Sequence, residues 1–353
     1  MKDTPKKKRA IVVGSGIAGL ASAIRLQFLG FEVDVFEQNS TYGGKIGVWS
    51  KNGYRFDTGP SLFTMPHFVE ELLLLDAKHD INFKYEKLNV LCNYFWNDGT
   101  ELTAYADQDK LEDEFETVLG EPKENIRKFL RKSKEKYEIT NHVFLEKSLH
   151  RVSTYLNLRT LKSILQLHKV QIFKKMNTEN RKVFVKNKTI QFFNRYATYN
   201  GSNPYQAPAT LNVIPHYEFG FGAFFPKKGI RSIADSLFEK AQNLGVQFHF
   251  NVPVTAVKRK PSGFQINNEH SADVVVCNMD VAAASKGPFS ELISTKRKSY
   301  EPSSSAVIFY WGIKKKFPEL DVHNIFFSAN YEEEFNTLFK DYDLADDLTV
   351  YVH

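Results

Sequence analysis

The chain has 353 residues, of which 42% are hydrophobic and 25% are charged, and its formal net charge is +6. This length favours two domains, and the composition is that of a soluble globular protein, which argues against a disordered chain and against a protein with many membrane spans. Lys and Arg are spread along the whole chain without forming a nucleic-acid-binding motif, so no nucleic-acid partner is expected.

The chain begins with a basic segment, residues 1–9, followed by an apolar run, an arrangement that superficially looks like a secretory signal. Gly14, Ser15 and Gly16 interrupt the apolar run, so a strand and a phosphate-binding loop explain it better. No stretch reaches the roughly 18 to 20 uninterrupted apolar residues of a membrane-spanning helix. Any association with a membrane is therefore expected to be peripheral.

Residues 9–13 predict a buried parallel strand, and residues 20–29 have the apolar spacing of a helix. Between them, Gly14 permits a tight turn, Gly16 lets the backbone approach a pyrophosphate, and Gly19 allows the helix to pack closely on the strand. The N–H groups at the start of the helix would bind the phosphates. The predicted dinucleotide-binding motif consists of Gly14, Ser15, Gly16, Ile17, Ala18 and Gly19.

Residues 31–36 alternate as in a second strand, which ends in Glu37, 37 − 19 = 18 residues beyond Gly19. That spacing places a carboxylate where it can accept hydrogen bonds from a ribose, and an acid there argues against a 2′-phosphorylated cofactor. The alternative is a solvated glutamate at the end of a strand.

The segment after Glu37 contains a double glycine followed by a basic residue, and it resembles the extended FAD fingerprint of the amine-oxidase and phytoene-desaturase superfamily. The glycines give the backbone freedom to pass close to a pyrophosphate, and Lys45 adds positive charge. The resemblance therefore implies FAD as the cofactor. The further cofactor-binding residues that it implies are Gln38, Gly43, Gly44, Lys45, Gly59, Pro60 and Ser61.

Four segments, residues 56–66, 197–205, 214–216 and 225–230, resemble the bacterial carotenoid desaturases of the phytoene desaturase family and keep that family's order. The resemblance covers most of the chain. It implies an FAD-dependent oxidoreductase of carotenoid biosynthesis that removes two hydrogens from a long polyene held in the lipid bilayer. The hydride would pass to the flavin and the proton to a weak base or water. Because a cation beside a polyene is delocalised, the reaction needs little help from acid or base side chains, and the catalytic residues are left unknown. The implied substrate-pocket residues are Met65, Tyr199, Asn200 and Tyr205.

Within this family, residues 59–66 are more similar to desaturases of hydroxylated or methoxylated carotenoids, which introduce a 3,4 double bond, than to phytoene desaturases. A phytoene desaturase is the first alternative. An amine oxidase or related flavoprotein with the same N-terminal fingerprint is the second, and residues 199–205 argue against it.

Residues 245–257 and 272–278 are rich in β-forming residues and predict more sheet around the turn at 261–263. The resemblance implies that here the chain returns to the FAD domain and that the backbone of Val254 meets the adenine. The fold expected is α/β, with a discontinuous Rossmann-like FAD-binding domain and an inserted α+β domain for substrate and membrane association. The expected bounds are 8–75 and 227–287 for the FAD domain, and 76–226 and 288–353 for the inserted domain.

A helical pattern covers residues 156–176 in the middle of the chain. Such a basic amphipathic helix can lie on an anionic bilayer, although a surface helix packed on the core is the commoner outcome. The expected apolar face consists of Leu158, Leu161, Leu165, Ile172 and Met176, and the basic residues elsewhere are Arg159, Lys162, Lys169 and Lys174.

Cys92 and Cys277 lack metal-ligand spacing, so we expect no disulfide, no metal site and a cytoplasmic protein that is peripheral to the membrane. The sequence has no HExxH, GxSxG or P-loop motif. His216 lies in a family-like segment, and a structural role is expected for it.

Residues 348–353 alternate as in a strand, and the sequence stops within it. Desaturases of this family continue with a late glycine motif beside the flavin ring, so a C-terminally incomplete chain is expected. The non-enzyme alternative is a fragment with a binding or scaffold role and no turnover. The oligomeric state is not predicted.

Overall fold

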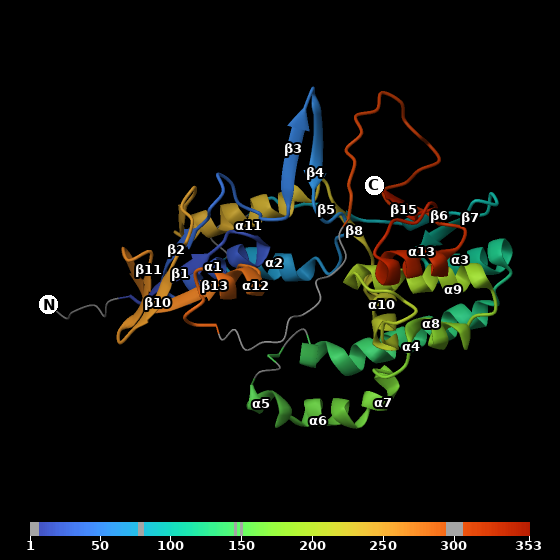
Figure 1. The fold of residues 1–353 in the computed structure, drawn as a ribbon, viewed down its shortest axis with the longest axis horizontal. Helices are drawn as coiled ribbons and strands as arrows, with labels where there is room; N and C mark the ends of the chain where they lie inside the picture. Colours follow the sequence, from blue (N-terminus) through green and yellow to red (C-terminus); the bar gives the residue numbers. More distant parts are fainter. Residues whose placement is uncertain (1–6, 77–80, 145–146, 149–150, 294–305) are drawn as a thin grey trace. The chain divides into compact units, whose positions relative to one another are not determined.

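The computed structural model describes residues 7–76, 81–144, 147–148, 151–293 and 306–353 (Figure 1). The chain divides into two compact units. The first is formed by Met1–Glu86 with Phe224–Tyr300, and the second by Lys87–Ala223 with Glu301–His353. Most of the second unit is thus an insertion into the sequence of the first.

The first unit contains four helices and two main groups of strands among its described residues. Its helices are α1 (Ile17–Phe28), α2 (His67–Leu73), α11 (Arg231–Asn243) and α12 (Val281–Lys286). Its strands are β1 (Arg9–Val13), β2 (Glu32–Phe36), β3 (Gly47–Lys51), β4 (Tyr54–Thr58), β8 (Phe224–Pro226), β9 (Gln247–His249), β10 (Val257–Lys260), β11 (Gly263–Ile266), β12 (His270–Ala272) and β13 (Val274–Cys277), and β5 (Tyr85–Lys87) lies at its boundary.

The main sheet of the first unit has the strand order β13-β1-β2-β9 and is parallel throughout. Ala10 and Val12 of β1 pack in the same core as α1 and α11, whereas Ile11 and Val13 pack in a second core with the antiparallel strands β10 to β12. Burial of both faces explains why β1 is a continuous apolar run. The prediction of an α/β fold with a Rossmann-like sheet is confirmed.

The second unit combines a mixed sheet with many short helices. Its strands are β6 (Val90–Phe95), β7 (Glu101–Tyr105), β14 (Asn324–Phe326) and β15 (Val350–Val352), in the order β15-β14-β6-β7. Its helices are α3 (Gln108–Glu114), η1 (Phe115–Leu119), α4 (Lys123–Phe144), α5 (Val152–Tyr155), α6 (Leu158–Leu165), α7 (Leu167–Val170), α8 (Met176–Arg181), α9 (Asn187–Asn194), η2 (Arg195–Asn200), η3 (Ala209–Val213), α10 (Pro215–Phe219), α13 (Tyr331–Asn336) and η4 (Thr337–Asp341).

The continuous helix expected over residues 156–176 is wrong, because the structure divides this stretch. Helix α7 ends at Val170, and the next residue, Gln171, has a left-handed φ of 60° that stops helical hydrogen bonding. Met176 then starts α8 and is fully buried, whereas Leu165 is exposed. The two residues therefore do not share a face, and Met176 does not belong to the outward surface that was predicted to include it.

Candidate cofactor site

The loop between β1 and α1 is held tightly against the neighbouring strands. Gly14 has a φ of +96°, and its N–H donates to the carbonyl of Phe36 at 2.8 Å. A Cβ on Gly19 would lie 2.0 Å from the carbonyl oxygen of Gly14, so only glycine lets α1 start this close to the strand. The first and third glycines of the predicted motif therefore have the conformational and packing roles expected of them.

The start of α1 is suited to an anion. Its N-cap is Gly16, which has no side chain to accept the first N–H groups, and no acidic residue lies in its first turn. Ile17, Ala18 and Gly19 thus leave backbone donors at the positive end of the helix dipole. This arrangement fits a phosphate or pyrophosphate group.

Glu37 lies at the end of β2 beside the glycine loop, and its carboxylate is buried. One oxygen accepts the N–H and the hydroxyl of Ser15, both at 2.8 Å, and the other accepts the N–H and Nδ2 of Asn39 at 2.9 and 2.8 Å. Burial alone raises the pKa of Glu37, but these hydrogen bonds outweigh it and hold the pKa below its ordinary value. Glu37 is therefore an ionised acceptor near neutral pH.

The double glycine packs directly on the first glycine loop. The N–H of Gly43 donates to the carbonyl of Ser15 at 2.9 Å, and a Cβ on Gly44 would lie 3.1 Å from the Cα of Gly16. Both glycines have left-handed φ angles, +99° and +59°. Two segments predicted separately from the sequence thus form one cradle of backbone atoms, which fits the close approach of a dinucleotide.

The remaining predicted cofactor residues differ in their contacts and in their exposure. A Cβ on Gly59 would lie 2.0 Å from the carbonyl oxygen of Lys45, so the segment of Gly59, Pro60 and Ser61 starts against the double-glycine loop. Val252 donates its N–H to the carbonyl of Glu37 at 2.9 Å, and this carries half-buried Val254 past the end of β2. The side chains of Gln38, Lys45 and Pro60 are exposed.

Arg231, on α11, supports the double-glycine loop and was not predicted from the sequence. Its Nη1 donates to the carbonyls of Tyr42 and Ile46, both at 2.9 Å, and its Nε pairs with Asp235 at 2.8 Å. Its guanidinium also lies over the ring of Tyr42, 4.4 Å from the ring centroid. These groups border a cavity of about 680 Å³ that Asn39, Thr41, Gly44 and Arg55 also line.

Asn278 follows β13 and is a second residue that sequence reasoning missed. Its N–H donates to the carbonyl of Val13 at 2.9 Å, and its Nδ2 lies 3.4 Å from the carbonyl oxygen of Gly14. A Cβ on Gly16 would approach the same Nδ2 to 3.0 Å. The amide therefore closes one side of the glycine loop. In the sequence, only the position of Asn278 directly after an apolar strand could have indicated this role.

Met65, a predicted substrate-pocket residue, belongs to the first unit and is buried just before α2. Its φ is +54°, a left-handed conformation that is uncommon for a residue with a long side chain. Strained backbone of this kind is concentrated at functional sites. Met65 lies in the segment that follows Gly59 to Ser61.

The other predicted pocket residues belong to the second unit. The hydroxyl of Tyr199 donates to Glu218 and lies 3.2 Å from Nη1 of Arg195, while Tyr196 donates to the same carboxylate at 2.7 Å. Burial and the Glu218 charge raise the pKa of Tyr199 well above its ordinary value. The phenol is thus anchored inward as a neutral group, although 39% of the residue surface is exposed.

Asn200 and Tyr205 complete the predicted pocket set. Asn200 is exposed and donates from Nδ2 to the hydroxyl of Ser202 at 3.2 Å. The ring of Tyr205 meets that of Phe335, with centroids 6.3 Å apart. His216 packs its ring against Tyr137 and Phe221, as a structural histidine does.

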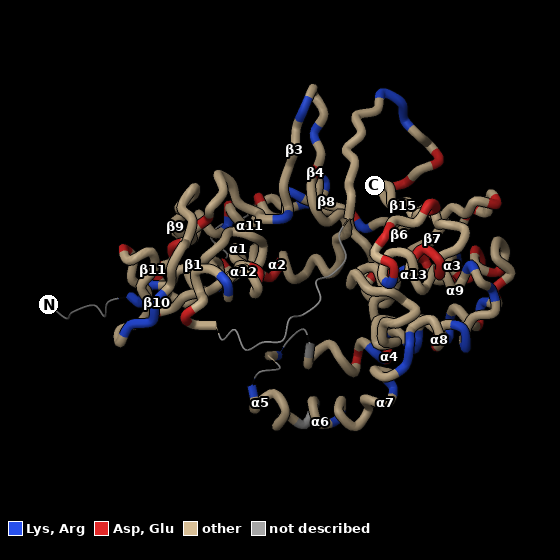
Figure 2. Tube along the Cα trace, viewed as in Figure 1, with Lys and Arg blue, Asp and Glu red and all other residues tan. Residues whose placement is uncertain are grey.

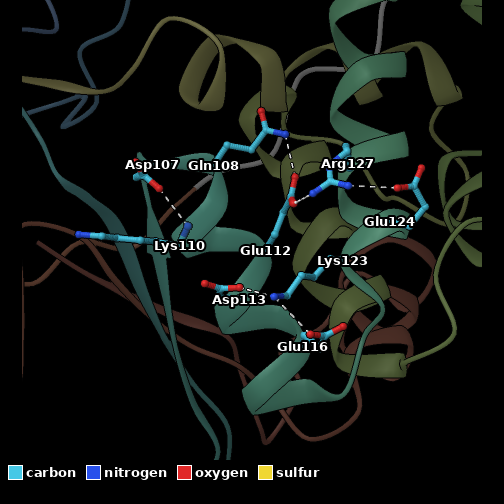
Figure 3. Close-up of polar contacts among 9 residues, drawn as sticks. All are labelled: Asp107, Gln108, Lys110, Glu112, Asp113, Glu116, Lys123, Glu124 and Arg127. Carbon is cyan, nitrogen blue, oxygen red and sulfur yellow. Dashed lines mark hydrogen bonds and ion pairs between the residues drawn. The ribbon is translucent and has the colours of Figure 1, made fainter.

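A separate polar cluster on α3 and α4 has a structural character (Figure 3). Buried Glu112 accepts hydrogen bonds from Gln108 at 2.8 Å and from Arg127 at 2.5 Å. Lys123 pairs with Asp113 and Glu116 in the same region. Here Lys123 and Arg127 each have an acidic partner. In the part of the chain that the structure describes, no cluster of His, Cys, Asp and Glu could hold a metal ion, and both cysteines are free.

Comparison with protein families gives a match over residues 17–341 to the flavin-containing amine oxidoreductases. Among individual proteins, the chain is 45% identical over 351 residues to a 1-hydroxycarotenoid 3,4-desaturase of Flavobacterium sp. (strain P99-3), covering 98% of this chain and 72% of that protein. It is 30% identical to a 4,4'-diapolycopene oxygenase of Methylomonas sp., covering 98% and 71%, and 30% identical to a phytoene desaturase of Phycomyces blakesleeanus, covering 98% and 61%.

Solved structures with the same fold include an oxidoreductase from Methanosarcina mazei, with a TM-score of 0.51, 18% identity, and coverage of 82% of this chain and 62% of that one. A putrescine oxidase bound to putrescine has a TM-score of 0.50 and 16% identity, with coverage of 76% and 56%. At these identities the likeness concerns the fold alone. The chain spans less than two thirds of either solved chain.

Proposed function

Because the chain belongs to the family of flavin-containing amine oxidoreductases, we propose that it is a carotenoid desaturase that introduces a 3,4 double bond into a hydroxylated carotenoid. Family membership makes it an FAD-dependent oxidoreductase. The observation that carries the choice of reaction is the 45% identity, over 98% of this chain, to a 1-hydroxycarotenoid 3,4-desaturase. The phytoene desaturases are further away, at 30% identity or below.

We assign FAD binding to the cradle in the first unit. The uncapped start of α1 and the double glycine would hold the pyrophosphate, and Glu37 would accept a ribose hydroxyl. Each carboxylate oxygen already accepts two hydrogen bonds, so a ribose hydroxyl would displace a side-chain donor, Ser15 Oγ or Asn39 Nδ2. The proposed set is Gly14, Gly16, Ile17, Ala18, Gly19, Glu37, Gln38, Gly43, Gly44, Lys45, Gly59, Pro60, Ser61 and Val254.

The substrate is assigned to the second unit, with Tyr199, Asn200 and Tyr205. Met65, which the resemblance also implied, belongs to the first unit and stays a separate prediction. Bound FAD would supply a two-electron acceptor for a hydride from an allylic carbon, and the proton of the adjacent carbon would pass to a weak base or water, leaving a double bond between the two carbons. The anchored phenol of Tyr199 suits it to present a fixed ring to a polyene rather than to transfer a proton.

We also propose that the protein acts in the cytoplasm at the surface of a membrane. A long polyene resides in lipid, so an enzyme that acts on it must reach the bilayer. No helix in the described ranges is long and apolar enough to cross a membrane. Contact through a surface of the folded protein would let the enzyme reach a substrate in lipid without a membrane-spanning helix.

Incubating the purified, flavin-loaded protein with a 1-hydroxycarotenoid, lycopene and phytoene tests the reaction. The expected result is a shift of the absorbance spectrum to longer wavelength with the hydroxylated substrate. Conversion of phytoene alone would replace the 3,4-desaturase assignment by that of a phytoene desaturase. Release of hydrogen peroxide with an amine, and no conversion of any carotenoid, would favour an amine oxidase of the same family.

A further inference from the structure

In helix α6 the polar side chains face inward and the apolar side chains face outward, the reverse of an ordinary surface helix. Thr160 and Ser163 face inward and are 2% and 8% exposed, whereas Leu165 is 78% exposed. The hydroxyl of Thr160 approaches Nε2 of His142 on α4 at 3.5 Å, so the inward face is built from polar contacts. Leu161 and Ile164 lie on the outward face with Leu165. A water-exposed helix normally shows the opposite arrangement.

The reversal continues on both sides of α6. In α5, Thr154 is buried and its hydroxyl donates to the carbonyl of Ser148 at 2.7 Å, while Val152 is exposed. Leu156, between α5 and α6, is 77% exposed, and Phe173, after α7, is 97% exposed. We call these outward residues the apolar face of α5–α7; it consists of Val152, Tyr155, Leu156, Leu161, Ile164, Leu165, Leu167, Ile172 and Phe173.

The charged residues within this segment of the chain all have one sign. Residues 147–178 contain no Asp or Glu, and their cations are Lys147, Arg151, Arg159, Lys162, Lys169, Lys174 and Lys175. Figure 2 accordingly shows blue and no red along α5, α6 and α7. On α3 and α4, by contrast, Arg127 and Lys123 have carboxylate partners (Figure 3). Within residues 147–178 the apolar face is thus accompanied by cations alone, and the flanking acids in the sequence are Glu146 and Glu179.

We propose that the apolar face of α5–α7 is the surface by which this protein binds an anionic lipid bilayer. Exposed leucines and phenylalanine enter the region between headgroups and acyl chains, and the lysines contact lipid phosphates. A second protein chain is a poorer match, because the cores of protein interfaces are depleted of lysine. This inference names the partner surface for the proposed peripheral location, and it rests on the proposed function for the reason that the substrate resides in lipid.

Vesicle flotation of the FAD-loaded full chain tests the proposal. With phosphatidylglycerol-containing vesicles, we expect Leu165→Ser/Phe173→Ser to lower the partition coefficient at least tenfold. Lys162→Glu/Lys169→Glu should lower it by a similar factor at low salt and by less at high salt. The matched controls, Leu344→Ser for an exposed leucine and Lys260→Glu for an exposed lysine, should bind as the unchanged protein does.

Insertion itself can be read with Leu165→Trp, whose fluorescence should shift to the blue with anionic vesicles and be quenched by brominated acyl chains. Equal binding by the apolar double variant, or binding to neutral and anionic vesicles alike, would overturn the proposal. A dimer in solution that Leu165→Ser/Phe173→Ser converts to a monomer, without vesicle binding, would assign the face to a second copy. Carotenoid turnover in detergent is measured separately, so failure of the desaturase assignment is distinguishable from failure of lipid binding.

Discussion

The carboxylate of Glu37 accepts two hydrogen bonds from Ser15, one from its N–H and one from its hydroxyl, both at 2.8 Å. The end of β2 and the glycine loop after β1 are therefore joined by one buried acid. The same carboxylate is assigned to the ribose of FAD. The structural and the binding role of Glu37 can be separated with two variants, one that removes the hydroxyl of Ser15 and one that removes the charge of Glu37.

Glu37→Gln is expected to weaken FAD binding at least tenfold. It removes the charge from hydrogen bonds worth about 1.5 to 3 kcal/mol each, and about 1.4 kcal/mol corresponds to tenfold in affinity. Ser15→Ala should change the affinity by less than about threefold, because it frees one acceptor position while weakening the loop. Titration of apoprotein with FAD, followed by flavin fluorescence, measures both, and Glu32→Gln at the exposed start of β2 is the control. Equal losses for Ser15→Ala and Glu37→Gln would argue for a purely structural carboxylate.

Gly19→Ala is expected to destabilise the first unit by at least about 2 kcal/mol and to abolish FAD binding. The added Cβ would lie 2.0 Å from the Gly14 carbonyl oxygen, which is backbone and cannot move without the loop. Gly30→Ala is the matched control. Gly30 also has a positive φ, +90°, but a Cβ there meets nothing within 4 Å, so only about 1 kcal/mol of backbone strain is expected. Urea unfolding gives both free energies, and a smaller loss for Gly19→Ala than for Gly30→Ala would contradict the packing argument.

Arg231→Met should raise the dissociation constant for FAD about tenfold or more, and Arg231→Lys by less. The guanidinium fork holds two carbonyls of the double-glycine loop, a geometry that an ammonium group reproduces only in part. Arg259→Met, at an exposed arginine of β10, is the control. Binding is compared at a temperature where the urea-unfolding curves show that each variant is folded. Unchanged affinity in folded Arg231→Met would show that the loop keeps its shape without this support.

The contrast between Glu37 and Arg231 shows what the sequence could reveal. Strand, glycine loop, helix and acid follow one another within 30 residues, so their spacing alone predicts the site. Arg231 and Asn278 reach the same loops from 185 or more residues away, and only the folded chain brings them there. The helices around Leu165 were predicted only in part. Periodicity identified an amphipathic surface but left open whether its apolar side packs on the core or faces outward, and burial of Thr160 and Ser163 shows that polar residues face inward.

Tyr199→Phe is expected to change KM for the carotenoid by less than about threefold, whereas Tyr199→Leu should raise it several-fold. The ring is retained in the first variant and lost in the second, and the proposed contact is made by the ring. Both variants leave Glu218 and Arg195 short of one partner, so both should lose about 1 to 3 kcal/mol of stability. Tyr342→Leu, an exposed tyrosine of the second unit, is the control. A KM that follows the loss of stability in both variants would make Tyr199 a structural residue only.

His323 should make the stability of the second unit depend on pH. Burial, with repulsion from His353 and Arg195, lowers the pKa of His323 from 6.5 to about 3. Below pH 6.5 the unfolded chain binds a proton that the folded chain does not, so stability is fully present above that pH and is lost as the pH falls towards 3. Between pH 7 and pH 5 this group accounts for about 2 kcal/mol of lost stability. His323→Gln should show a correspondingly smaller loss in urea unfolding at the two pH values, while His168→Gln, at an exposed histidine of the same unit, should behave as the unchanged protein. Equal pH dependence in His323→Gln and the unchanged protein would place the titrating group elsewhere.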